Sequence, residues 1–247
     1  MKNNFRNNYP IVNLHKKKNL KSSIDTQLLY GDNFKVIKAL GGWKKIKIKK
    51  DGYIGYIKNK KFLPSVKLNY KVSVLKARIF NEPNSKKKLK KFLPYESRLK
   101  ITEKYRKFAK FENNWIKISD LQKINFKNND IFKNIKLFKN IKYLWGGKSY
   151  KGIDCSALVQ IFFNQNNKYC PRDSKDQERY FKKKIKLKNI KKNDLLFWKG
   201  HVAIALSKSK LIHAYGPKKK VVIMDIKRTI ERIKRNANLK VTSVRRI

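Results

Sequence analysis

The sequence predicts an α+β protein in which one or two small all-β barrels precede a domain of helices and an antiparallel sheet. Three observations support this. Residues 23–66 consist of short segments in which apolar and polar residues alternate, separated by turns that contain glycine. Residues 67–124 repeat this texture more loosely. Residues 125–247 begin with helical apolar spacing and continue with several short apolar strands, which indicates a different kind of domain.

The first 22 residues are basic and contain neither the apolar segment nor the small-residue cleavage site of a secretory signal. We expect residues 1–22 to form a flexible basic arm or an extended lead-in strand. No run of the sequence approaches the roughly eighteen apolar residues of a transmembrane helix. These features favour a cytoplasmic protein without a membrane span. In that compartment the two cysteines stay free unless they have a function.

The barrel predicted for residues 23–66 is based on segments such as FKVIKAL and KKIKIK, which alternate with period two. The dipeptides Gly-Asp, Gly-Gly and Asp-Gly mark turns between them. Several short strands within about forty residues are typical of a small antiparallel barrel. Trp43 in GGWKKIKI and Trp115 in NNWIKI occupy similar places, which suggests that residues 67–124 are a diverged duplication of the first barrel.

The domain predicted from residue 125 begins with two helical patterns. Apolar residues recur through residues 131–141 behind an Asn-Asn-Asp cap, and again through GIDCSALVQIFF, residues 152–163. PRDSKDQERYF indicates a further short helix. The segments DLLFW, HVAIAL, LIHAYG, KVVIMDI and VTSVRRI then predict the strands of an antiparallel sheet.

Cys155 stands at the predicted start of the second helix. The helix dipole and free backbone N–H groups there lower a thiol pKa from its usual value of about 8.5. A nucleophilic thiol also needs a histidine as proton acceptor and a polar group that orients it. His201 and His213 both lie in the predicted hairpin that follows. A three-residue loop places His213 opposite Ala203 with His201 as its diagonal neighbour, whereas a two-residue loop places the histidines on opposite faces.

Other interpretations of these residues are open. A single cysteine is more often a small buried residue, and a single histidine in a strand is more often structural. A zinc site formed by Cys155, the two histidines and Cys170 is a further alternative, but neither cysteine shows CxxC spacing. The combination favours Cys155 as nucleophile, His201 as base and acid, and His213 as the orienting group, with no metal and no cofactor.

The charge of the chain is unusual, with 65 Lys and Arg against 16 Asp and Glu and a formal net charge of +49. A nucleic-acid or membrane-surface binder would carry such a charge. However, the lysines are spread along the whole chain and occur with abundant Ile, Asn, Phe and Tyr, all of which have AT-rich codons. Compositional drift explains this pattern, so we expect no specific nucleic-acid partner and only non-specific attraction of polyanions.

Four motifs carry a resemblance to a known family: YLWGGKSYKGIDCSALVQ, PRDSKDQ, NDLLFWKGHVAIAL and LIHAYG. In order and spacing they resemble the NlpC/P60 papain-like cysteine peptidases, over roughly residues 129–247. The stretch TQLLYGDNFKVI, with GGW and DGYIGYI after it, resembles the bacterial SH3-type domain that precedes this peptidase in certain members. The combined architecture is similar to the γ-D-glutamyl-L-diamino acid endopeptidases (dipeptidyl-peptidase VI). Those enzymes cut murein peptides with a free N-terminal L-Ala between γ-D-Glu and the diamino acid.

The resemblance implies that Cys155, His201 and His213 are the catalytic residues and that Tyr143 lies near the scissile carbonyl. The family's substrate-contacting positions match Asp154, Ser156, Asp173 and Ser174. Two positions depart from the family pattern, because Ala157 and Asn193 stand where glycine is usual.

A substrate with a free ammonium group needs a carboxylate partner, which Asp154 or Asp173 could supply. Asp154 could equally cap its helix, and the two roles are compatible. Asp32 and Tyr53 of the first barrel are candidates for closing the same subsite.

We therefore expect a cytoplasmic, monomeric cysteine peptidase that acts on murein peptides in cell-wall peptide recycling, with the barrels limiting the groove to short peptides. One alternative is an amidase or acyltransferase that uses the same Cys–His core on another amide. The other is a non-catalytic protein that binds cell wall or polyanions. The presence of all three catalytic residue types argues against the non-catalytic alternative.

Overall fold

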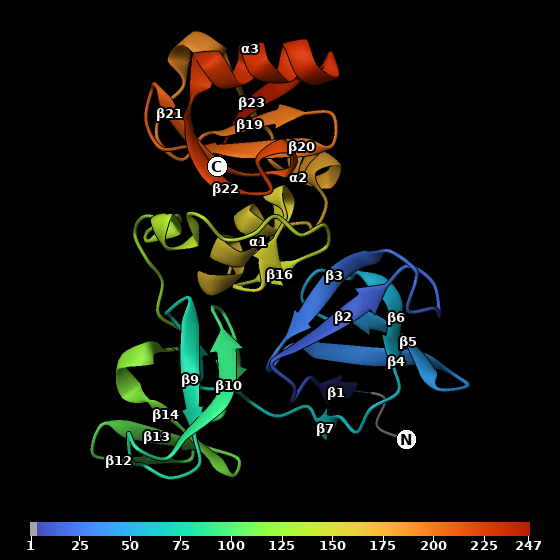
Figure 1. Cartoon of the computed structure of the whole chain (residues 1–247), viewed down its shortest axis with the longest axis vertical. Helices are drawn as coiled ribbons and strands as arrows, with labels where there is room; N and C mark the ends of the chain where they lie inside the picture. The colour runs from blue at the N-terminus through green and yellow to red at the C-terminus, as the bar shows by residue number, and fades with distance from the viewer. Residues whose placement is uncertain (1–3) are drawn as a thin grey trace. The chain divides into compact units, whose positions relative to one another are not determined.

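The computed structural model describes residues 4–247, which cluster into two compact units (Figure 1). The first unit runs to residue 127 and includes residues 148–150 and 165–167. The second unit comprises residues 128–147, 151–164 and 168–247. The mixture of helices and strands confirms the predicted α+β class.

The first unit begins with a seven-stranded sheet of order β3-β2-β6-β5-β4-β1-β7. Its strands are β1 (Asn4–Arg6), β2 (Ile11–His15), β3 (Ile24–Leu29), β4 (Asn33–Leu40), β5 (Trp43–Ile48), β6 (Ile54–Lys58) and β7 (Leu63–Pro64). Alternate residues such as Leu14, Phe34 and Ile46 are fully buried and form one core. The predicted Gly41-Gly42 turn joins β4 to β5 with both residues in the left-handed region, at φ 45° and 76°. The period-two pattern therefore predicted this sheet correctly.

The prediction of a flexible arm is wrong for most of residues 4–15. β1 pairs with β4 and β7, and β2 pairs with β3 and β6, so both strands belong to the sheet. Leu14 and His15 of β2 are buried, which holds the strand in the core despite the basic residues that follow. The extended lead-in strand was the correct alternative, and residues 1–3 lie outside the described part.

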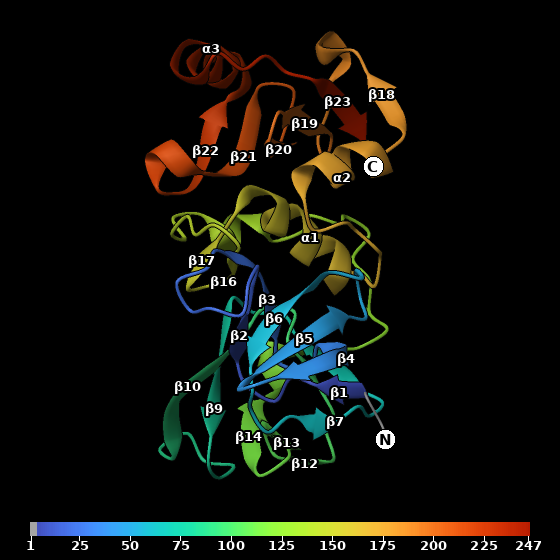
Figure 2. The ribbon, with the colours of Figure 1, turned by 90° about the vertical axis from the view of Figure 1, so that its right-hand side faces the viewer.

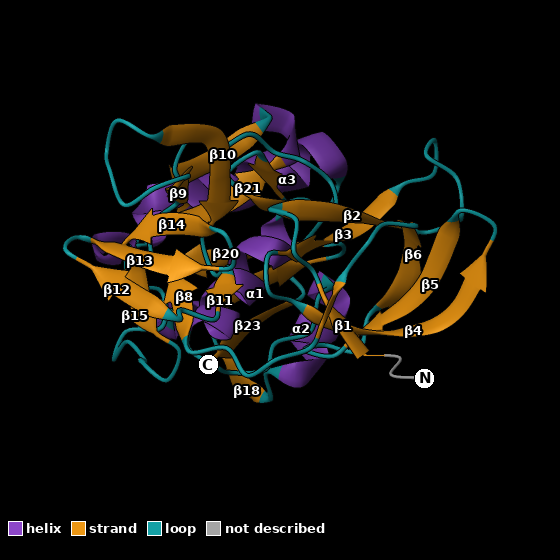
Figure 3. Cartoon of the chain, turned by 90° about the horizontal axis from the view of Figure 1, so that it is seen from below, coloured by secondary structure: helices purple, strands orange, loops and turns teal. Residues whose placement is uncertain are grey.

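The remainder of the first unit contains a five-stranded sheet, β10-β9-β14-β13-β12, and a three-stranded sheet, β11-β8-β15. The strands are β8 (Tyr70–Val72), β9 (Lys76–Phe80), β10 (Lys88–Pro94), β11 (Arg98–Leu99), β12 (Glu103–Tyr105), β13 (Phe108–Phe111), β14 (Asn114–Lys117) and β15 (Leu121–Lys123), with a 3-10 helix η1 (Ile118–Asp120). Every labelled element of the first unit in Figure 3 is a strand. The predicted boundaries between residues 66 and 67 and between 124 and 125 stay predictions, as does the duplication.

The second unit is built on a six-stranded antiparallel sheet of order β18-β23-β19-β20-β21-β22. The strands are β18 (Lys183–Ile185), β19 (Leu195–Trp198), β20 (His201–Ala205), β21 (Lys210–Tyr215), β22 (Lys220–Asp225) and β23 (Ser243–Arg246). The helices are α1 (Cys155–Gln165), α2 (Ser174–Tyr180) and α3 (Ile226–Ala237), with 3-10 helices η2 (Ile135–Phe138), η3 (Leu187–Asn189) and η4 (Gly216–Lys218). The short strand β17 (Gly152–Ile153) precedes α1, whereas β16 (Lys148–Ser149) belongs to the first unit.

One helix of the second unit was missed by the sequence analysis and another was overextended. α3 lies next to β22 (Figure 2). Its residues Ile226 and Ile233 belong to the same buried cluster as Leu196 and Trp198 of β19. Asp225 caps α3 by accepting from the Arg228 N–H. An aspartate before a helical segment is a sequence signal for the start of a helix. The helix predicted for residues 131–141 shrinks to η2.

The physical reason for the shorter helix is the conformation of two asparagines. Asn134 and Asn140 adopt left-handed backbone angles, at φ 68° and 67°, on either side of η2. A left-handed residue breaks the i to i−4 hydrogen-bond ladder of an α-helix. The apolar residues of the pattern, including Ile131, Phe132 and Phe138, are still buried. Their spacing therefore indicated burial correctly and helix length wrongly.

The core beneath α3 gives a stability prediction. Ile233 is buried at 4% exposure among residues of the sheet. Ile233→Ala should lower the free energy of unfolding by about 2–5 kcal/mol, because it removes buried methyl groups and leaves a cavity. Urea denaturation followed by tryptophan fluorescence measures this. Leu187→Ala is the control, since Leu187 is 42% exposed and should change stability by no more than about 0.5 kcal/mol. Equal effects of the two substitutions would contradict the packing of α3.

Candidate active site

Cys155 is the first residue of α1 and is buried at 6% exposure. Asp154 caps the helix, because its Oδ1 accepts from the Ala157 N–H at 2.8 Å. The backbone N–H of Val202, in β20, donates to the Cys155 sulfur. The thiol therefore lies against the strand that begins with His201.

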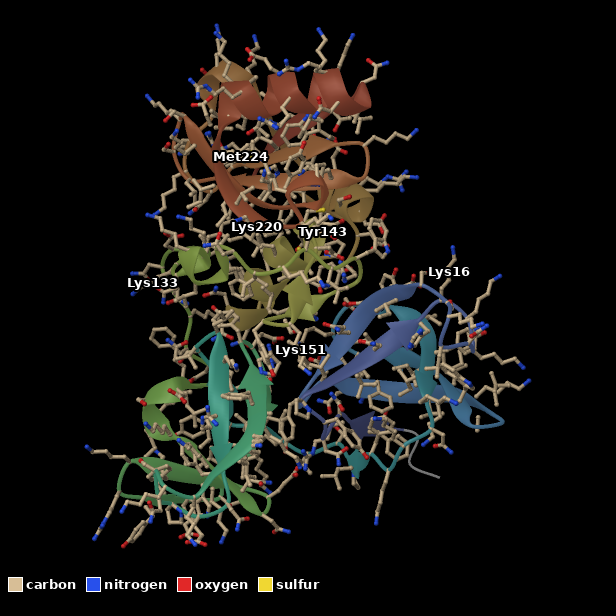
Figure 4. All side chains as sticks on the ribbon, viewed as in Figure 1. Lys16, Lys133, Tyr143, Lys151, Lys220 and Met224 are labelled. Atoms are coloured by element: carbon tan, nitrogen blue, oxygen red, sulfur yellow. The ribbon has the colours of Figure 1, made fainter. Side chains whose placement is uncertain are left out.

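The segment before the nucleophile packs closely. A Cβ atom at Gly147 would lie 2.5 Å from the carbonyl oxygen of Gly152, so only glycine fits there. The Gly146 N–H donates to Asp154 Oδ2 at 2.9 Å. These contacts tie the Tyr-Leu-Trp-Gly-Gly loop to the start of α1. They place Tyr143, labelled in Figure 4, close enough to Cys155 and Asp154 for their charges to act on its hydroxyl.

Asp154 forms a buried ion pair with Arg172. The guanidinium donates to Oδ2 at 2.6 Å and to Oδ1 at 3.0 Å, and it also donates to Ser156 Oγ at 2.9 Å. Ser156 Oγ in turn donates to Asp154 Oδ1 at 3.2 Å. A carboxylate has about four lone-pair positions, and here it accepts five donors. The helix cap predicted for Asp154 is thus present, and its oxygens are already occupied by protein donors.

Arg172 was missed by the sequence analysis, although it stands in the quoted PRDSKDQ motif. The signal that could have found it is the burial expected for Asp154 beside a nucleophile, since a buried carboxylate requires a cationic partner. Gln177 was missed as well. Its side-chain amide donates to the carbonyl oxygens of Ser156 and Pro171, both at 2.9 Å, and so links α2 to the start of α1.

The two histidines share one face of the β20–β21 hairpin. The register pairs Ile204 with Ile212 and Ala205 with Leu211, and continuing it places Ala203 opposite His213. This is the register of the three-residue loop, Ser207–Ser209. His201 Nε2 lies 2.8 Å from His213 Nδ1, within hydrogen-bonding distance. The structure therefore brings the imidazoles together in the arrangement that the longer loop predicts.

Aromatic rings surround the imidazole pair. His213 is fully buried and stacks on Tyr215, with ring centroids 4.7 Å apart and planes inclined by 10°. The ring of Trp198 lies 5.6 Å from that of His201. His201 keeps a partly exposed edge. The rings restrict both imidazoles while leaving His201 a route to solvent or substrate.

Burial controls the protonation of the catalytic groups. It raises the pKa of the Cys155 thiol to about 12, with the Asp154 charge adding to the effect. It lowers the pKa of His201 to about 4 and that of His213 well below its ordinary value. Burial also raises the pKa of Tyr143 well above the ordinary range, and the negative charge of Asp154 adds to this effect, as a thiolate at Cys155 would. The resting site therefore holds a neutral thiol, two neutral imidazoles and a protonated phenol.

This result corrects the expectation that the helix start lowers the thiol pKa. The Val202 and Ser156 N–H groups and the Arg172 charge do favour the thiolate. Removal of the sulfur from water outweighs them, and the Asp154 charge repels a thiolate beside it. Cys155 must therefore transfer its proton to His201 as the reaction proceeds.

The remaining predicted contacts are distributed over both units. Ser174 is buried at the start of α2, and Asp173 precedes it as an exposed residue at the N-cap position. In the first unit, Asp32 is buried and accepts from Lys50 Nζ at 2.8 Å and from the Leu29 N–H at 2.8 Å. Burial alone would raise the pKa of Asp32, but Lys50 and Lys148 lower it to about 2. Tyr53 packs on the core of the first sheet. The role of Asp32 and Tyr53 in closing a subsite stays a prediction.

The described part of the chain contains no cluster of side chains suited to bind a metal ion. Within residues 4–247, no three His, Cys, Asp or Glu side chains group closely enough to hold a metal ion. The alternative zinc site of Cys155, the histidines and Cys170 is therefore not assembled there. In the same range, none of the helices combines the length and apolar character that crossing a bilayer requires.

A cysteine at a helix start, beside a β-hairpin whose two strands each contribute one imidazole to a pair, is the arrangement of papain-like thiol hydrolases. Comparison with known families matches residues 140–236 to the NlpC/P60 family and residues 14–62 to the bacterial dipeptidyl-peptidase SH3 domain. The chain thus contains a stretch similar to the NlpC/P60 family over residues 140–236, with a stretch similar to an SH3 domain before it. This confirms the resemblance seen in the sequence.

Two relatives and one solved structure illustrate the similarity. A dipeptidyl-peptidase 6 from Lysinibacillus sphaericus is 42% identical over 72 residues, covering 29% of this chain and 27% of that protein. The chain thus spans about a quarter of this relative. A gamma-D-glutamyl-L-lysine dipeptidyl-peptidase from Bacillus subtilis (strain 168) is 27% identical over 232 residues, covering 84% of this chain and 77% of the relative. A crystal structure of an NlpC/P60 family protein from Bacillus cereus ATCC 10987 shares the fold, with a TM-score of 0.83 at 18% identity over 98% of this chain and 99% of that one.

The buried ion pair gives a first prediction for the site. Arg172→Met should destabilise the protein by about 3–5 kcal/mol, because it leaves the Asp154 carboxylate buried without its partner. Arg179→Met is the matched control, since the Arg179–Asp176 pair is exposed and 4.0 Å apart; it should cost less than about 1 kcal/mol. Urea denaturation measures both. The double variant Asp154→Asn with Arg172→Met should recover part of the loss, and additive losses would show that the two residues are not coupled.

The low pKa of His201 predicts an unusual pH profile. The neutral imidazole is the base, so kcat/KM should fall only as the pH drops through about 4, well below the ordinary histidine value near 6.5. Initial rates at low substrate concentration between pH 4 and 8 measure the profile, with circular dichroism at each pH as a control for unfolding. A half-maximal value near pH 6.5 in folded protein would contradict the burial of this base.

Proposed function

We propose that this chain hydrolyses the γ-D-glutamyl–diamino acid bond of murein peptides that carry a free N-terminal L-Ala, in the recycling of cell-wall peptides. The observation that carries the proposal is the contact of the Cys155 thiol with β20, the strand that contributes His201 to the His201–His213 pair. The similarity to the Bacillus subtilis gamma-D-glutamyl-L-lysine dipeptidyl-peptidase supports the choice of bond. We also propose that the enzyme acts as a cytoplasmic monomer without a cofactor.

The reaction follows from the protonation state of the site. The Cys155 thiol gives its proton to the free nitrogen of His201 as the sulfur attacks the amide carbonyl. Backbone N–H groups at the start of α1 and the protonated hydroxyl of Tyr143 stabilise the oxyanion. His201 then protonates the leaving amine as the C–N bond breaks, which leaves a thioester on Cys155. Water, activated by neutral His201, hydrolyses the thioester and restores the thiol.

The ammonium group of the substrate requires a carboxylate, and the hydrogen bonding around Asp154 favours Asp173 for this role. All acceptor positions of Asp154 are taken by Arg172, Ser156 and two backbone N–H groups. Asp173 is exposed at the start of α2, immediately after Arg172. We propose that Asp154 contributes charge and helix position, and that Asp173 provides the contact with the amine. Ser156 and Ser174 would contact substrate beside it.

The central test compares the two cysteines of the chain. Cys155→Ala should abolish release of L-Ala-γ-D-Glu from L-Ala-γ-D-Glu-diaminopimelate, with a loss of at least about a thousandfold because the nucleophile is removed. Chromatography with mass detection measures the product. Cys170→Ala is the matched control, since Cys170 is a second buried cysteine that takes no part in the proposed reaction; it should keep activity. Full activity in the Cys155 variant would end the proposal.

The same assay separates the proposed peptidase from an amidase or acyltransferase that uses the same core. N-terminal acetylation of the peptide removes the ammonium group. It should reduce kcat/KM by about tenfold to a hundredfold, because one charge-assisted hydrogen bond to the substrate is lost. Asp173→Asn should reduce kcat/KM on the free peptide and so make it more similar to kcat/KM on the acetylated peptide. Equal rates on both peptides would favour an enzyme that acts on another amide.

A further inference from the structure

The two ring nitrogens of His213 have different partners. Nδ1 faces His201 Nε2 at 2.8 Å, and Nε2 faces the sulfur of Met224 at 3.4 Å. Met224 lies on β22 in the second unit (Figure 4). A methionine at the far end of a catalytic histidine pair is a feature that the proposed mechanism does not use.

The register of the sheet sets the position of this methionine. β21 pairs with β22 so that His213 is opposite Val222 and Leu211 is opposite Met224. Met224 is therefore the diagonal neighbour of His213 on the same face, within reach of a long side chain. It packs against the hydrophobic cluster that contains Leu211 and Tyr215. Its sulfur is held against the ring by the sheet and by the core.

The chemistry of the thioether restricts where the proton on His213 can be. A thioether sulfur accepts hydrogen bonds and has no proton to donate. His213 is neutral, because burial keeps its pKa well below the ordinary value. A neutral imidazole carries one N–H, on either Nδ1 or Nε2. Only the tautomer with the proton on Nε2 makes a hydrogen bond to Met224.

We propose that Met224 is a positioning residue that fixes the tautomer of the histidine pair. With its proton on Nε2, His213 presents a lone pair at Nδ1 and accepts the Nε2–H of His201. The single proton of neutral His201 is then on Nε2, so its Nδ1 carries the lone pair that takes the proton from Cys155. Met224 thus fixes the tautomer of His213, and His213 fixes the tautomer of His201. As a result His201 can accept the proton of the Cys155 thiol.

The opposite tautomer would disable the base. A proton on His213 Nδ1 would turn the Nε2 lone pair towards the sulfur lone pairs and would require His201 to accept at Nε2. His201 would then carry its proton on Nδ1 and could not take one from the thiol. A thioether is a weak acceptor, so this hydrogen bond biases the equilibrium by about threefold to tenfold, which is enough to make the competent tautomer the major one.

The direct test is the histidine tautomer in solution. The chain contains three histidines, so protein labelled with ¹⁵N-histidine gives a spectrum simple enough to assign, with His15 of the first unit as an internal reference. At neutral pH both His201 and His213 should show protonated Nε2 and unprotonated Nδ1. A protonated Nδ1 on His213 in the unmodified protein would overturn the proposal, whatever any variant does.

Met224→Leu removes the acceptor with little change in volume. It should give His213 a mixture of tautomers and lower kcat by up to about twofold, with KM unchanged, because the fraction of competent base falls to about half. Val222→Ile is the matched control: it changes the residue opposite His213 without altering any acceptor, and should leave tautomers and kcat unchanged. An unaltered tautomer and unaltered kcat in folded Met224→Leu would overturn the proposal.

The expected change in kcat of Met224→Leu rests on the proposed function, whereas the expected change in the tautomer of His213 does not. If Cys155→Ala keeps its activity while Met224→Leu shifts the tautomers, the inference on Met224 stands and the proposed mechanism fails. If Cys155→Ala is inactive and Met224→Leu changes neither readout, the mechanism stands and Met224 has only a packing role.

Discussion

The site depends most on the buried ion pair of Asp154 and Arg172. One carboxylate receives hydrogen bonds from the start of α1, from Gly146 in the glycine loop, and from Arg172 just before α2. Three segments that are separate in sequence therefore meet at one point, beside the nucleophile. Burying two charges is costly unless each is fully paired, so only one arrangement of these three segments is favourable. That arrangement also fixes the position of the Cys155 thiol.

The same burial sets the chemistry. Removal of water raises the pKa of Cys155 and lowers that of His201, so the proton stays on sulfur in the resting enzyme. A neutral thiol is less exposed to oxidation than a thiolate, because the thiolate is the reactive form. In return, the thiol and His201 must become oppositely charged while the sulfur attacks the substrate carbonyl. Backbone N–H groups at the helix start and Tyr143 can stabilise that charge only once a substrate carbonyl is in place.

Several parts of this structure were readable from the sequence because they depend on local rules. The period-two segments became β4 and β5, the short apolar segments became β19–β21, and the motif around Cys155 became α1. The failures had non-local causes. Left-handed Asn134 and Asn140 shortened a helix whose apolar spacing was otherwise convincing. The sequence indicated Asp154 as a cap but did not identify Arg172 as its partner, because that contact depends on how two loops pack. The thiol pKa was misjudged in direction because burial was not visible from the sequence.

The histidine pair shows why residues beyond the catalytic ones matter to such a site. A buried imidazole can act as a base only if its proton is on the correct nitrogen, and solvent cannot correct the tautomer of a fully buried ring. The neighbour that decides the tautomer must be a group with a single hydrogen-bonding role. An amide or hydroxyl can both donate and accept and so tolerates either tautomer, whereas a thioether only accepts. A methionine side chain, usually regarded as hydrophobic packing, can therefore fix the hydrogen-bond direction in a chain that reaches the nucleophile through two histidines.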